Sequence, residues 1–483
     1  MNEEYEEEMF EEMLEPEEVE RLKVPKLVSK YMRRALEISN YNPIPAGINA
    51  FVLLGQAFKN YVAIPVGPSK VDLRVHFIWI QTSGTGKSQM WNFVRPVSES
   101  VFNTINAIES HEERSLDEYS IFDTKEYTAA ALIGSSRPLT SAEQAMYDDD
   151  EDAPTSMEVK GELFGSGLAS WDEFENSGVF KESGHKEGII NYLNTYMNDM
   201  WGQTYIMTKK LASGDLISCE CQRSTYATTY IPENLTKIIV TKGVLQRMVI
   251  YIRDVPVEEQ KKMNAKQISM IGKASDSQIV VDDISQEIVE VYKKLKKRYK
   301  QRGENPINTI QYDDSFSQAI QLKYNAMVAL VETSPKKIRD LGLNFSTRLR
   351  VSLQKMATIC CILESADDEI TDKRWVATSK HVNQAFLLLR ECYNGLLTWL
   401  ESSIRMPKSV LQKEKTLTEF EKAYTQAEKE LDGFVKKNTI REIYVSNGNS
   451  QAKFYTDWSK IKSNWLSRKE GKVVFVKPKG DEE

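Results

Sequence analysis

Residues 73–88 read LRVHFIWIQTSGTGKS and give the strongest indication of the fold. The first eight are mostly β-branched, aromatic or apolar, which is typical of a buried strand. The Gly- and Ser-rich segment that follows leads into a helical pattern from Gln89 to about Ala107. A strand, a glycine-rich loop and a helix in this order form a phosphate-binding loop in α/β proteins. The stretch therefore predicts an α/β core.

Residues 81–88 supply each chemical part of such a loop. Glycines let the backbone N–H groups curl around a phosphate, a lysine reaches the β- and γ-phosphates, and a Ser or Thr hydroxyl ligates Mg²⁺. Gln81 stands where the strict pattern has glycine, and a Gly/Ser-rich turn with an incidental lysine is the alternative. The context favours ATP and Mg²⁺ binding by Ser83, Gly84, Thr85, Gly86, Lys87 and Ser88.

An acidic pair follows a second apolar strand, Leu163 to Trp171. Asp172 would hold Mg²⁺, and Glu173 would polarise the attacking water. An exposed acidic strand end is the alternative, and the phosphate-binding loop upstream favours catalysis. The spacing is typical of the additional-strand, catalytic-glutamate class of nucleoside triphosphatases.

Two further candidates flank strand-like runs. Thr228 or Thr229 closes the strand predicted at 222–229 and could orient the lytic water, although a Thr-rich strand end is equally consistent with the pattern. Arg247 comes just before the strand predicted at 248–253. A guanidinium there could neutralise charge in phosphoryl transfer on a neighbouring subunit, or it could form a surface ion pair.

The chain of 483 residues is long enough for roughly two to four domains. Its net charge of −7 is unevenly distributed, because residues 1–20 hold eleven Glu and residues 148–152 read DDDED. Residues 109–122 and 135–160 look like surface loops. We expect an acidic disordered tail at 1–22, N-terminal helices at 23–72, an ATPase core at 73–282, a helical domain at 283–405 and a C-terminal domain at 416–480.

The C-terminal segment is basic. Residues 433–480 contain eleven Lys or Arg against three acids, with aromatic residues interleaved. Two short helices, a basic turn and the strand VVFV resemble a winged helix, which binds DNA or docks other proteins. A lysine-rich solvated surface is a further alternative. The candidate DNA-binding residues here are Lys453, Lys460, Lys462, Arg468 and Lys469.

Composition excludes several classes of protein. No apolar run approaches the ~20 residues of a membrane span, so we expect no membrane partner. The acidic N-terminus lacks the features of a secretory signal, and the five cysteines show neither zinc spacing nor a disulfide framework. These features predict a cytoplasmic, intracellular protein.

Five motifs together resemble the AAA+ core of minichromosome-maintenance (MCM) replicative helicases and related phage and plasmid helicases. They are GTGKS, WDEFE, a hairpin with Lys209 and Lys210, YATTYIPENL and GVLQRMVIYIRDV, and the similarity covers roughly residues 75–400. The departures are Gln81, Thr in place of the family's usual Asn at sensor 1, and the absence of the family's N-terminal DNA-binding collar. These departures favour a mobile-element or phage protein.

The resemblance implies roles for particular residues. Arg247 would be the finger that acts in trans, Thr229 would be sensor 1, and Arg348 in STRLR would be sensor 2 on a lid helix. Lys209 and Lys210 would lie on a DNA-contacting hairpin. The implied fold is a P-loop AAA+ core, a parallel sheet flanked by helices, with a helical lid domain and a C-terminal winged-helix-like domain.

These observations together predict an ATP-dependent DNA helicase that acts as a hexameric ring on single-stranded and forked DNA. Primase and polymerase are possible partners. One alternative is an ATP-switched replication initiator or helicase loader that does not itself separate strands. A P-loop ATPase that acts on protein is another, which the basic C-terminus and the hairpin lysines disfavour.

Overall fold

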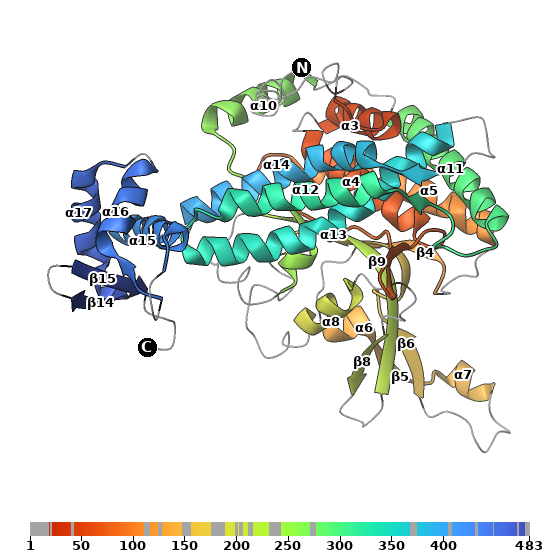
Figure 1. Cartoon of the computed structure of the whole chain (residues 1–483). Coiled ribbons are helices and arrows are strands. Elements are labelled where there is room, and N and C mark those ends of the chain that lie inside the picture. Colours follow the sequence, from red (N-terminus) through yellow and green to blue (C-terminus); the bar gives the residue numbers. More distant parts are fainter. Residues whose placement is uncertain are drawn as a thin grey trace. The chain divides into compact units, whose positions relative to one another are not determined.

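The computed structural model has two compact units, which are described separately (Figure 1). The larger comprises Met1–Tyr324 and Thr347–Trp399, and the smaller comprises Asn325–Ser346 and Leu400–Glu483. The structure describes residues 19, 22–39, 43–110, 116–123, 128–146, 156–174, 189–198, 201, 206–210, 216–230, 243–270, 277–367, 374–403, 408–429, 433–447, 449–470 and 473–478.

A parallel sheet forms the centre of the larger unit. Its neighbouring strands are all parallel and follow the order β10 (Val249–Arg253), β3 (Phe77–Gln81), β9 (Leu216–Thr229), β7 (Gly165–Trp171) and β4 (Tyr119–Asp123). Every residue of β3 and β7 is buried, as expected for a sheet with both faces covered. This confirms the predicted α/β class with a mostly parallel sheet flanked by helices.

The helices of the larger unit form an early group and a later group in the chain. The first group, which packs together, is α3 (Lys26–Ser39), α4 (Pro43–Phe58), α5 (Lys87–Glu109) and α11 (Ser277–Gln301). Helix α4 is buried along its whole length and packs against β9, β7 and β3. The later helices are α10 (Val257–Met270), α12 (Asp314–Val331), α13 (Lys336–Asp367) and α14 (Ser379–Ser403), of which the last three each continue into the smaller unit.

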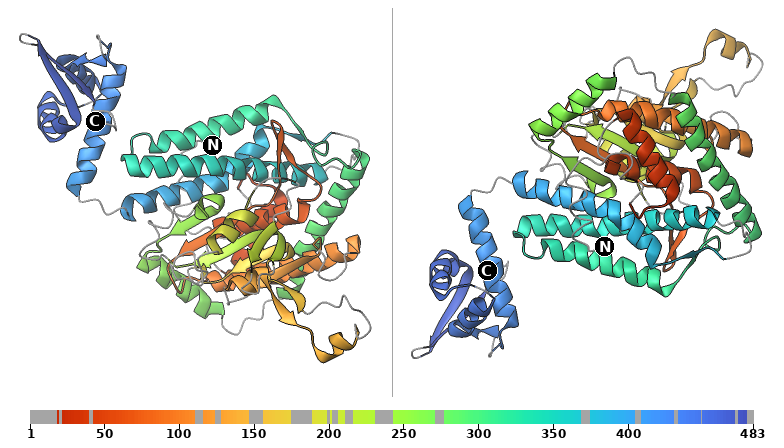
Figure 2. Two further views of the ribbon diagram at one scale, coloured as in Figure 1. Left: turned by 90° about the horizontal axis from the view of Figure 1, so that it is seen from below. Right: turned by 90° about the horizontal axis from the view of Figure 1, so that it is seen from above.

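Helices α13 and α14 lie side by side in the larger unit (Figure 2). The amide of Gln384 in α14 donates a hydrogen bond of 2.6 Å to Glu364 in α13. Short paired strands complete this unit: β1 (Ile64–Val66) with β2 (Ser69–Val71), and β11 (Gln311–Tyr312) with β12 (Val376–Ala377). Within the described ranges, no helix is long and apolar enough to cross a bilayer.

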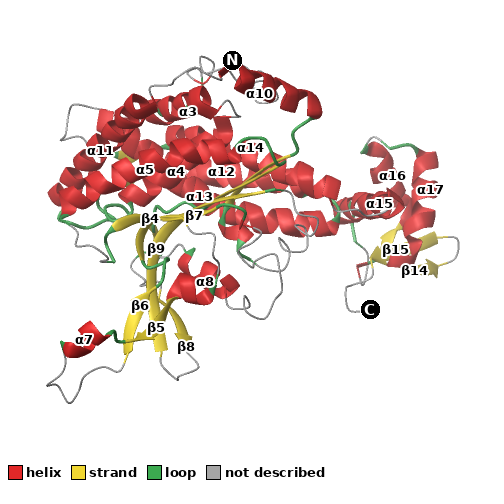
Figure 3. Ribbon diagram, turned by 180° about the vertical axis from the view of Figure 1, so that it is seen from behind, coloured by secondary structure: helices red, strands yellow, loops and turns green. Residues whose placement is uncertain are grey.

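A β-rich extension continues from the first half of β9 (Figure 3). Strand β8 (Ile206–Lys210) pairs antiparallel with β9, which confirms the predicted hairpin. The predicted loop at 135–160 is corrected in part, because it contains β5 (Gly134–Pro138) and β6 (Ser156–Lys160), which form an antiparallel pair. The helices of this region are α6 (Ala129–Ile133), α7 (Ser141–Ala145) and α8 (Ile189–Tyr196).

Strand β4 corrects the prediction of a surface loop at 109–122. The Asn106 side chain in α5 donates to and accepts from the Tyr119 backbone, at 2.8 and 2.9 Å. The buried Arg223 guanidinium of β9 donates to the Ser120 carbonyl at 2.7 Å. Polar tertiary contacts therefore hold this edge strand, and hydrophobic periodicity does not detect them. The apolar run at 237–241 also predicts a strand, but it lies outside the described residues, as do the 148–152 loop and nearly all of the acidic tail.

The smaller unit includes a three-stranded sheet in the order β13 (Val435–Lys436), β15 (Val473–Pro478), β14 (Trp465–Glu470). Its helices are α15 (Lys408–Gln426), α16 (Lys437–Ser446) and α17 (Gln451–Ile461). Phe420, Tyr444 and Phe454 belong to its core. Arg468 and Lys469 were predicted in a turn, but they lie in β14, where cross-strand pairing with β15 extends the hairpin.

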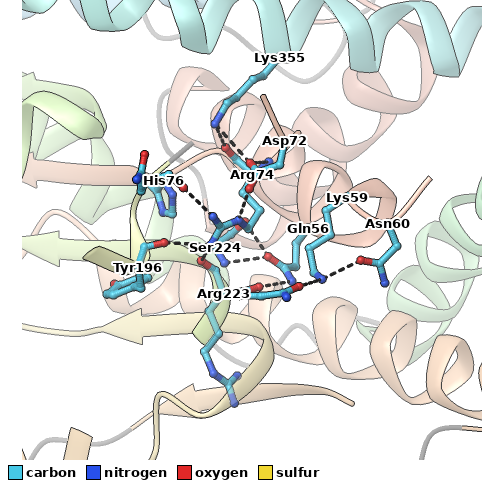
Figure 4. A network of polar contacts seen from close by, with 12 residues as sticks. Gln56, Lys59, Asn60, Asp72, Arg74, His76, Tyr196, Arg223, Ser224 and Lys355 are labelled. Carbon is cyan, nitrogen blue, oxygen red and sulfur yellow. Dashed lines mark hydrogen bonds and ion pairs between the residues drawn. The ribbon is translucent and has the colours of Figure 1, made fainter. Parts of the chain in front are cut away.

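A buried polar network lies beside the amino-terminal end of β3 (Figure 4). The Arg74 guanidinium, only 1% exposed, donates to the Asp72 carboxylate at 2.7 Å. The Lys355 ammonium of α13 donates to the Arg74 carbonyl at 2.6 Å and lies 3.6 Å from Asp72. Breaking such a buried pair by removing one partner costs about 3–5 kcal/mol, because the other charge is left uncompensated.

Lys59, which directly follows α4, adds a buried amine to this network. Its ammonium donates to Asn60 Oδ1 at 2.9 Å and to Gln222 Oε1 at 2.7 Å. Burial, with a smaller contribution from Arg74, lowers the pKa of Lys59 from 10.5 to about 7. The protonated form is therefore disfavoured in the folded chain near neutral pH.

We predict that Lys59 makes folding stability depend on pH. Between about pH 7 and pH 10 the unfolded chain binds this proton and the folded chain does not, so the free energy of unfolding rises with pH. In Lys59→Met this rise should be reduced by on the order of a few kcal/mol. Denaturant titrations at several pH values measure it, with the exposed Lys261→Met as control. Equal slopes for Lys59→Met and the wild type would contradict the prediction.

We also predict that Gly167 in β7 tolerates no side chain. A Cβ there would lie 1.9 Å from the Ser120 carbonyl oxygen of β4, and the residue has a φ of +116°. Gly167→Ala should lower the free energy of unfolding by about 3 kcal/mol or more, because two strands must separate. Gly303→Ala is the control, since Gly303 also has positive φ but open space around it, and should cost about 1 kcal/mol. Similar losses in both variants would show that backbone strain, not overlap, dominates.

Candidate nucleotide-binding site

A cavity of about 340 Å³ lies at the carboxyl ends of β3, β7 and β9. Residues of the glycine-rich loop, the acidic pair after β7 and the threonines ending β9 share it. Because carboxyl ends of parallel strands meet at one sheet edge, segments nearly 150 residues apart in the chain converge there. The lining residues are Ser83, Gly84, Gly86, Lys87, Ser88, Gln89, Asp172, Glu173, Thr228, Thr229 and Tyr230.

The loop has the backbone that its glycines predict. Gly84 has a φ of +73°, and Gly86 caps the amino terminus of α5 with a φ of +86°. The Lys87 ammonium folds back onto the carbonyls of Gln81 and Thr82, at 2.7 and 3.2 Å. The loop thus presents a helix amino terminus and a lysine to the cavity, the combination that binds phosphate.

The structure explains why Gln81 can replace the first glycine of the motif. Gln81 is the last residue of β3 and pairs with Arg253 of β10, so its backbone is extended. Its buried side chain accepts a hydrogen bond of 2.8 Å from the Trp79 indole nitrogen. The loop bends after this position, at Gly84 and Gly86. Thr85 is buried and does not line the cavity; its hydroxyl donates to the Thr82 carbonyl inside the loop.

Asp172 directly follows β7 and accepts two hydrogen bonds. The Thr228 hydroxyl donates to Asp172 Oδ1 at 2.8 Å, and the Glu173 backbone N–H donates to the same oxygen at 3.2 Å. Glu173 itself is exposed and has a φ of +52°, a strained conformation for a residue with a side chain. This turn directs the two carboxyl groups differently: Asp172 toward Thr228, and Glu173 toward solvent at the cavity.

β9 lies between β3 and β7, so the strand carrying the loop and the strand before the acidic pair are not adjacent. This is the arrangement that an additional-strand triphosphatase requires. The inserted strand also delivers Thr228 and Thr229 to the cavity, where both are almost fully buried. Thr228 contacts Asp172, whereas Thr229 was the residue singled out by the resemblance.

Arg247 lies at the amino-terminal ends of the strands, whereas the cavity lies at their carboxyl ends. It ends a short 3₁₀ helix (Leu245–Arg247) just before β10, whose first residue, Val249, pairs with Phe77 at the start of β3. Its guanidinium donates to Asn194 Oδ1 at 2.8 Å and to the Gly243 carbonyl at 3.0 Å. Arg247 is therefore not brought to the cavity of its own chain.

The remaining candidates in the larger unit are not cavity residues. Arg348 is exposed on α13 and does not line the cavity. Lys209 and Lys210 lie in β8, opposite Ile217 and Leu216 of β9, and their side chains fall outside what the structure describes.

The predicted basic residues of the smaller unit are on its surface, and several are paired. Lys460 lies 3.0 Å from Asp457, and Arg468 lies 3.0 Å from Glu470. The Arg468–Glu470 pair is exposed on both sides and contributes little stability, whereas the Asp457 carboxylate is buried and also accepts a hydrogen bond from the Tyr444 hydroxyl. The exposed lysines of this set are Lys453, Lys460, Lys462 and Lys469.

Two groups of residues were missed from the sequence. Asp254 follows β10 and accepts a hydrogen bond of 3.0 Å from the Thr82 hydroxyl of the loop; the convergence of strand ends could have revealed it. In the smaller unit, the Lys437 ammonium lies 4.7 Å from the centre of the Trp458 ring, and Arg441 donates to the Tyr455 hydroxyl at 3.0 Å. No local pattern links these pairs, because α16 and α17 meet only on folding.

No protein-family model matches the chain, and no curated protein matches it significantly. What the cavity binds must therefore be inferred from its own residues. A helix amino terminus and Lys87 suit a phosphate, while Ser88 and Asp172 offer the hydroxyl and carboxylate oxygens that Mg²⁺ accepts in nucleotide sites. The residues present thus fit a magnesium nucleotide.

We predict that Thr228 acts through Asp172 on metal-dependent nucleotide binding. Thr228→Val keeps the shape but removes the donor to Asp172, so affinity for ATP with Mg²⁺ should fall about tenfold. Affinity measured in EDTA should not change, and Thr228→Ser should behave as the wild type. Titration with a fluorescent ATP analogue measures both affinities. An equal loss with and without Mg²⁺ would contradict a role through Asp172.

Proposed function

We propose that this protein is an ATP-driven DNA helicase of the AAA+ type, a homo-oligomeric ring that moves on single-stranded DNA and separates duplex strands. The observation that carries the proposal is the shared cavity. It joins a phosphate-binding loop, an acidic pair and strand-end threonines across an inserted strand. The motifs that resemble MCM-type helicases support a role in replication.

Each residue at the cavity has a role in ATP hydrolysis under this proposal. The loop and Lys87 bind the phosphates, and Ser88 with Asp172 holds Mg²⁺, which neutralises charge on the phosphates when bound. Glu173 accepts a proton from the attacking water, for which its exposed position beside the cavity is suitable. Thr229 lies where it could orient that water.

Arg247 favours a ring over a monomer under the proposal. Within one chain Arg247 lies at the amino-terminal ends of the strands and the cavity lies at their carboxyl ends. Arg247 can therefore reach a triphosphate only in a neighbouring copy. A guanidinium supplied in this way stabilises the charge of the transition state. Arg348, exposed on its helix, is a second candidate for such a contact.

The smaller unit supports DNA as the partner. Its elements follow the order helix, strand, two helices and a β-hairpin, which is the order of a winged helix. α17 carries Lys453 and Lys460 on its exposed side, and Lys462 follows it directly. Together with the β8–β9 hairpin carrying Lys209 and Lys210, this would give two phosphate-contacting elements per subunit.

A replication initiator or helicase loader is the second candidate, favoured by the same winged-helix order. It would use ATP as a conformational switch and bind DNA without separating strands. Turnover decides between them, because a switch hydrolyses slowly once bound to DNA. A protein-acting ATPase would show no salt-sensitive DNA binding.

We predict that strand displacement requires Glu173. With ATP and Mg²⁺, the wild type should displace a strand from a forked duplex, and Glu173→Gln at equal concentration should fall to about 1% of that rate. Both proteins should bind ATP and the fork, which fluorescence anisotropy checks. If neither protein displaces the strand although both bind the fork, the helicase proposal fails and the initiator or loader gains support.

A further inference from the structure

Asn194 lies beside Arg247, on a helix that is not part of the cavity. Helix α8 packs against β8 and β9, and Asn194 is half-buried in its last turn. Its side-chain oxygen accepts a hydrogen bond of 2.8 Å from Nη1 of Arg247. The same nitrogen donates to the Gly243 carbonyl at 3.0 Å. Two acceptors from separate segments therefore hold Nη1 of Arg247. Because the guanidinium is planar and rigid, fixing this nitrogen also sets the orientation of the rest of the group.

Helix α8 is itself fixed in place by the buried network. The Arg74 guanidinium donates to the carbonyls of Tyr196 and Asn198, at 3.0 and 2.8 Å, where the helix ends (Figure 4). These carbonyls lie at the helix end, where intrahelical donors are lacking, and the cation also suits the negative end of the helix dipole. The Tyr196 hydroxyl lies 2.8 Å from the Thr225 hydroxyl of β9. A helix anchored at its end in this way gives Asn194 little freedom to move.

The backbone at Gly243 matches this arrangement. Gly243 has a φ of +66°, and a Cβ there would lie 3.4 Å from Arg247 Nη1 and 3.8 Å from Asn194 Oδ1. These are ordinary contact distances, so glycine is favoured here by the positive φ of the turn and not by lack of space. The turn directs the Gly243 carbonyl to Arg247, which also contacts the Asn194 side chain.

We infer that Asn194 is a positioning residue for Arg247, holding its guanidinium in the direction needed to act on a neighbouring subunit's triphosphate. The inference rests on the proposed function, since it requires Arg247 to act in trans. Asn194 does not touch the nucleotide in this account. Removing its oxygen frees the Arg247 side chain to sample several rotamers, so fewer encounters place the guanidinium correctly.

The test measures ATP turnover and nucleotide affinity in the full-length protein with single-stranded DNA. Arg247→Ala should lower kcat about 100-fold, and Asn194→Ala should lower it about tenfold, with ATP affinity within about threefold of the wild type in both. Asn194→Leu, which fills the space without an acceptor, should match Asn194→Ala. Asn191→Ala on the same helix is the control and should leave kcat unchanged.

A mixing experiment separates action in trans from local damage. An excess of Glu173→Gln subunits cannot hydrolyse ATP but supplies an intact Arg247, so adding them to Asn194→Ala subunits should raise turnover above that of either protein alone. Arg247→Ala should be rescued in the same way.

Four results would overturn the inference. Wild-type turnover in Asn194→Ala, or restored turnover in Asn194→Leu, would show that the hydrogen bond is not needed. Rescue of Arg247→Ala without rescue of Asn194→Ala would assign the loss to the variant's own fold. If Arg247→Ala itself turns over like the wild type, the trans role in the proposed function fails, and the inference fails with it.

Discussion

The buried ion pair between Asp72 and Arg74 connects the parts of the larger unit that the candidate site depends on. Arg74 lies shortly before β3, and its guanidinium also donates to backbone carbonyls at the end of α8 and in β9. Lys355 attaches α13 to the same point. A guanidinium can do this because its five donors lie in one rigid plane, so one side chain satisfies acceptors from several segments. Contacts with Arg74 thus hold the sheet, α8 and α13 in fixed positions relative to one another.

The carboxyl and amino-terminal ends of the strands carry different groups of candidate residues. Parallel strands place all carboxyl ends on one side, where Lys87, Asp172 and Thr228 share a cavity. The amino-terminal side carries Arg247 and the helix that contacts it. Strand β10 connects the two sides, because Arg247 precedes it and Asp254, which follows it, contacts the glycine-rich loop. In the proposed ring, a rigid strand would then link each subunit's own loop to its neighbour's site.

The sequence predicts the features that consecutive residues determine, and it misses those that depend on contacts between residues far apart in the chain. The glycine-rich loop was recognisable because its glycines, lysine and serine are consecutive and its strand is apolar throughout. β4 was not, because Tyr119 and Phe122 are its only fully buried residues and polar contacts from Asn106 and Arg223 hold it in place. Strand β14 was read as a turn because RKEG is polar, although pairing with β15 extends it.

The sequence by itself determined the α/β class, the loop and the residue types suited to bind a magnesium nucleotide, since these follow from consecutive residues and strand periodicity. Only the tertiary structure decided which residues meet. It placed Asp172 against Thr228, buried Gln81 where a glycine was expected, and set Arg247 against Asn194 across the sheet from the cavity. Such pairings depend on strand order and helix packing, which are fixed by contacts between residues far apart in the chain.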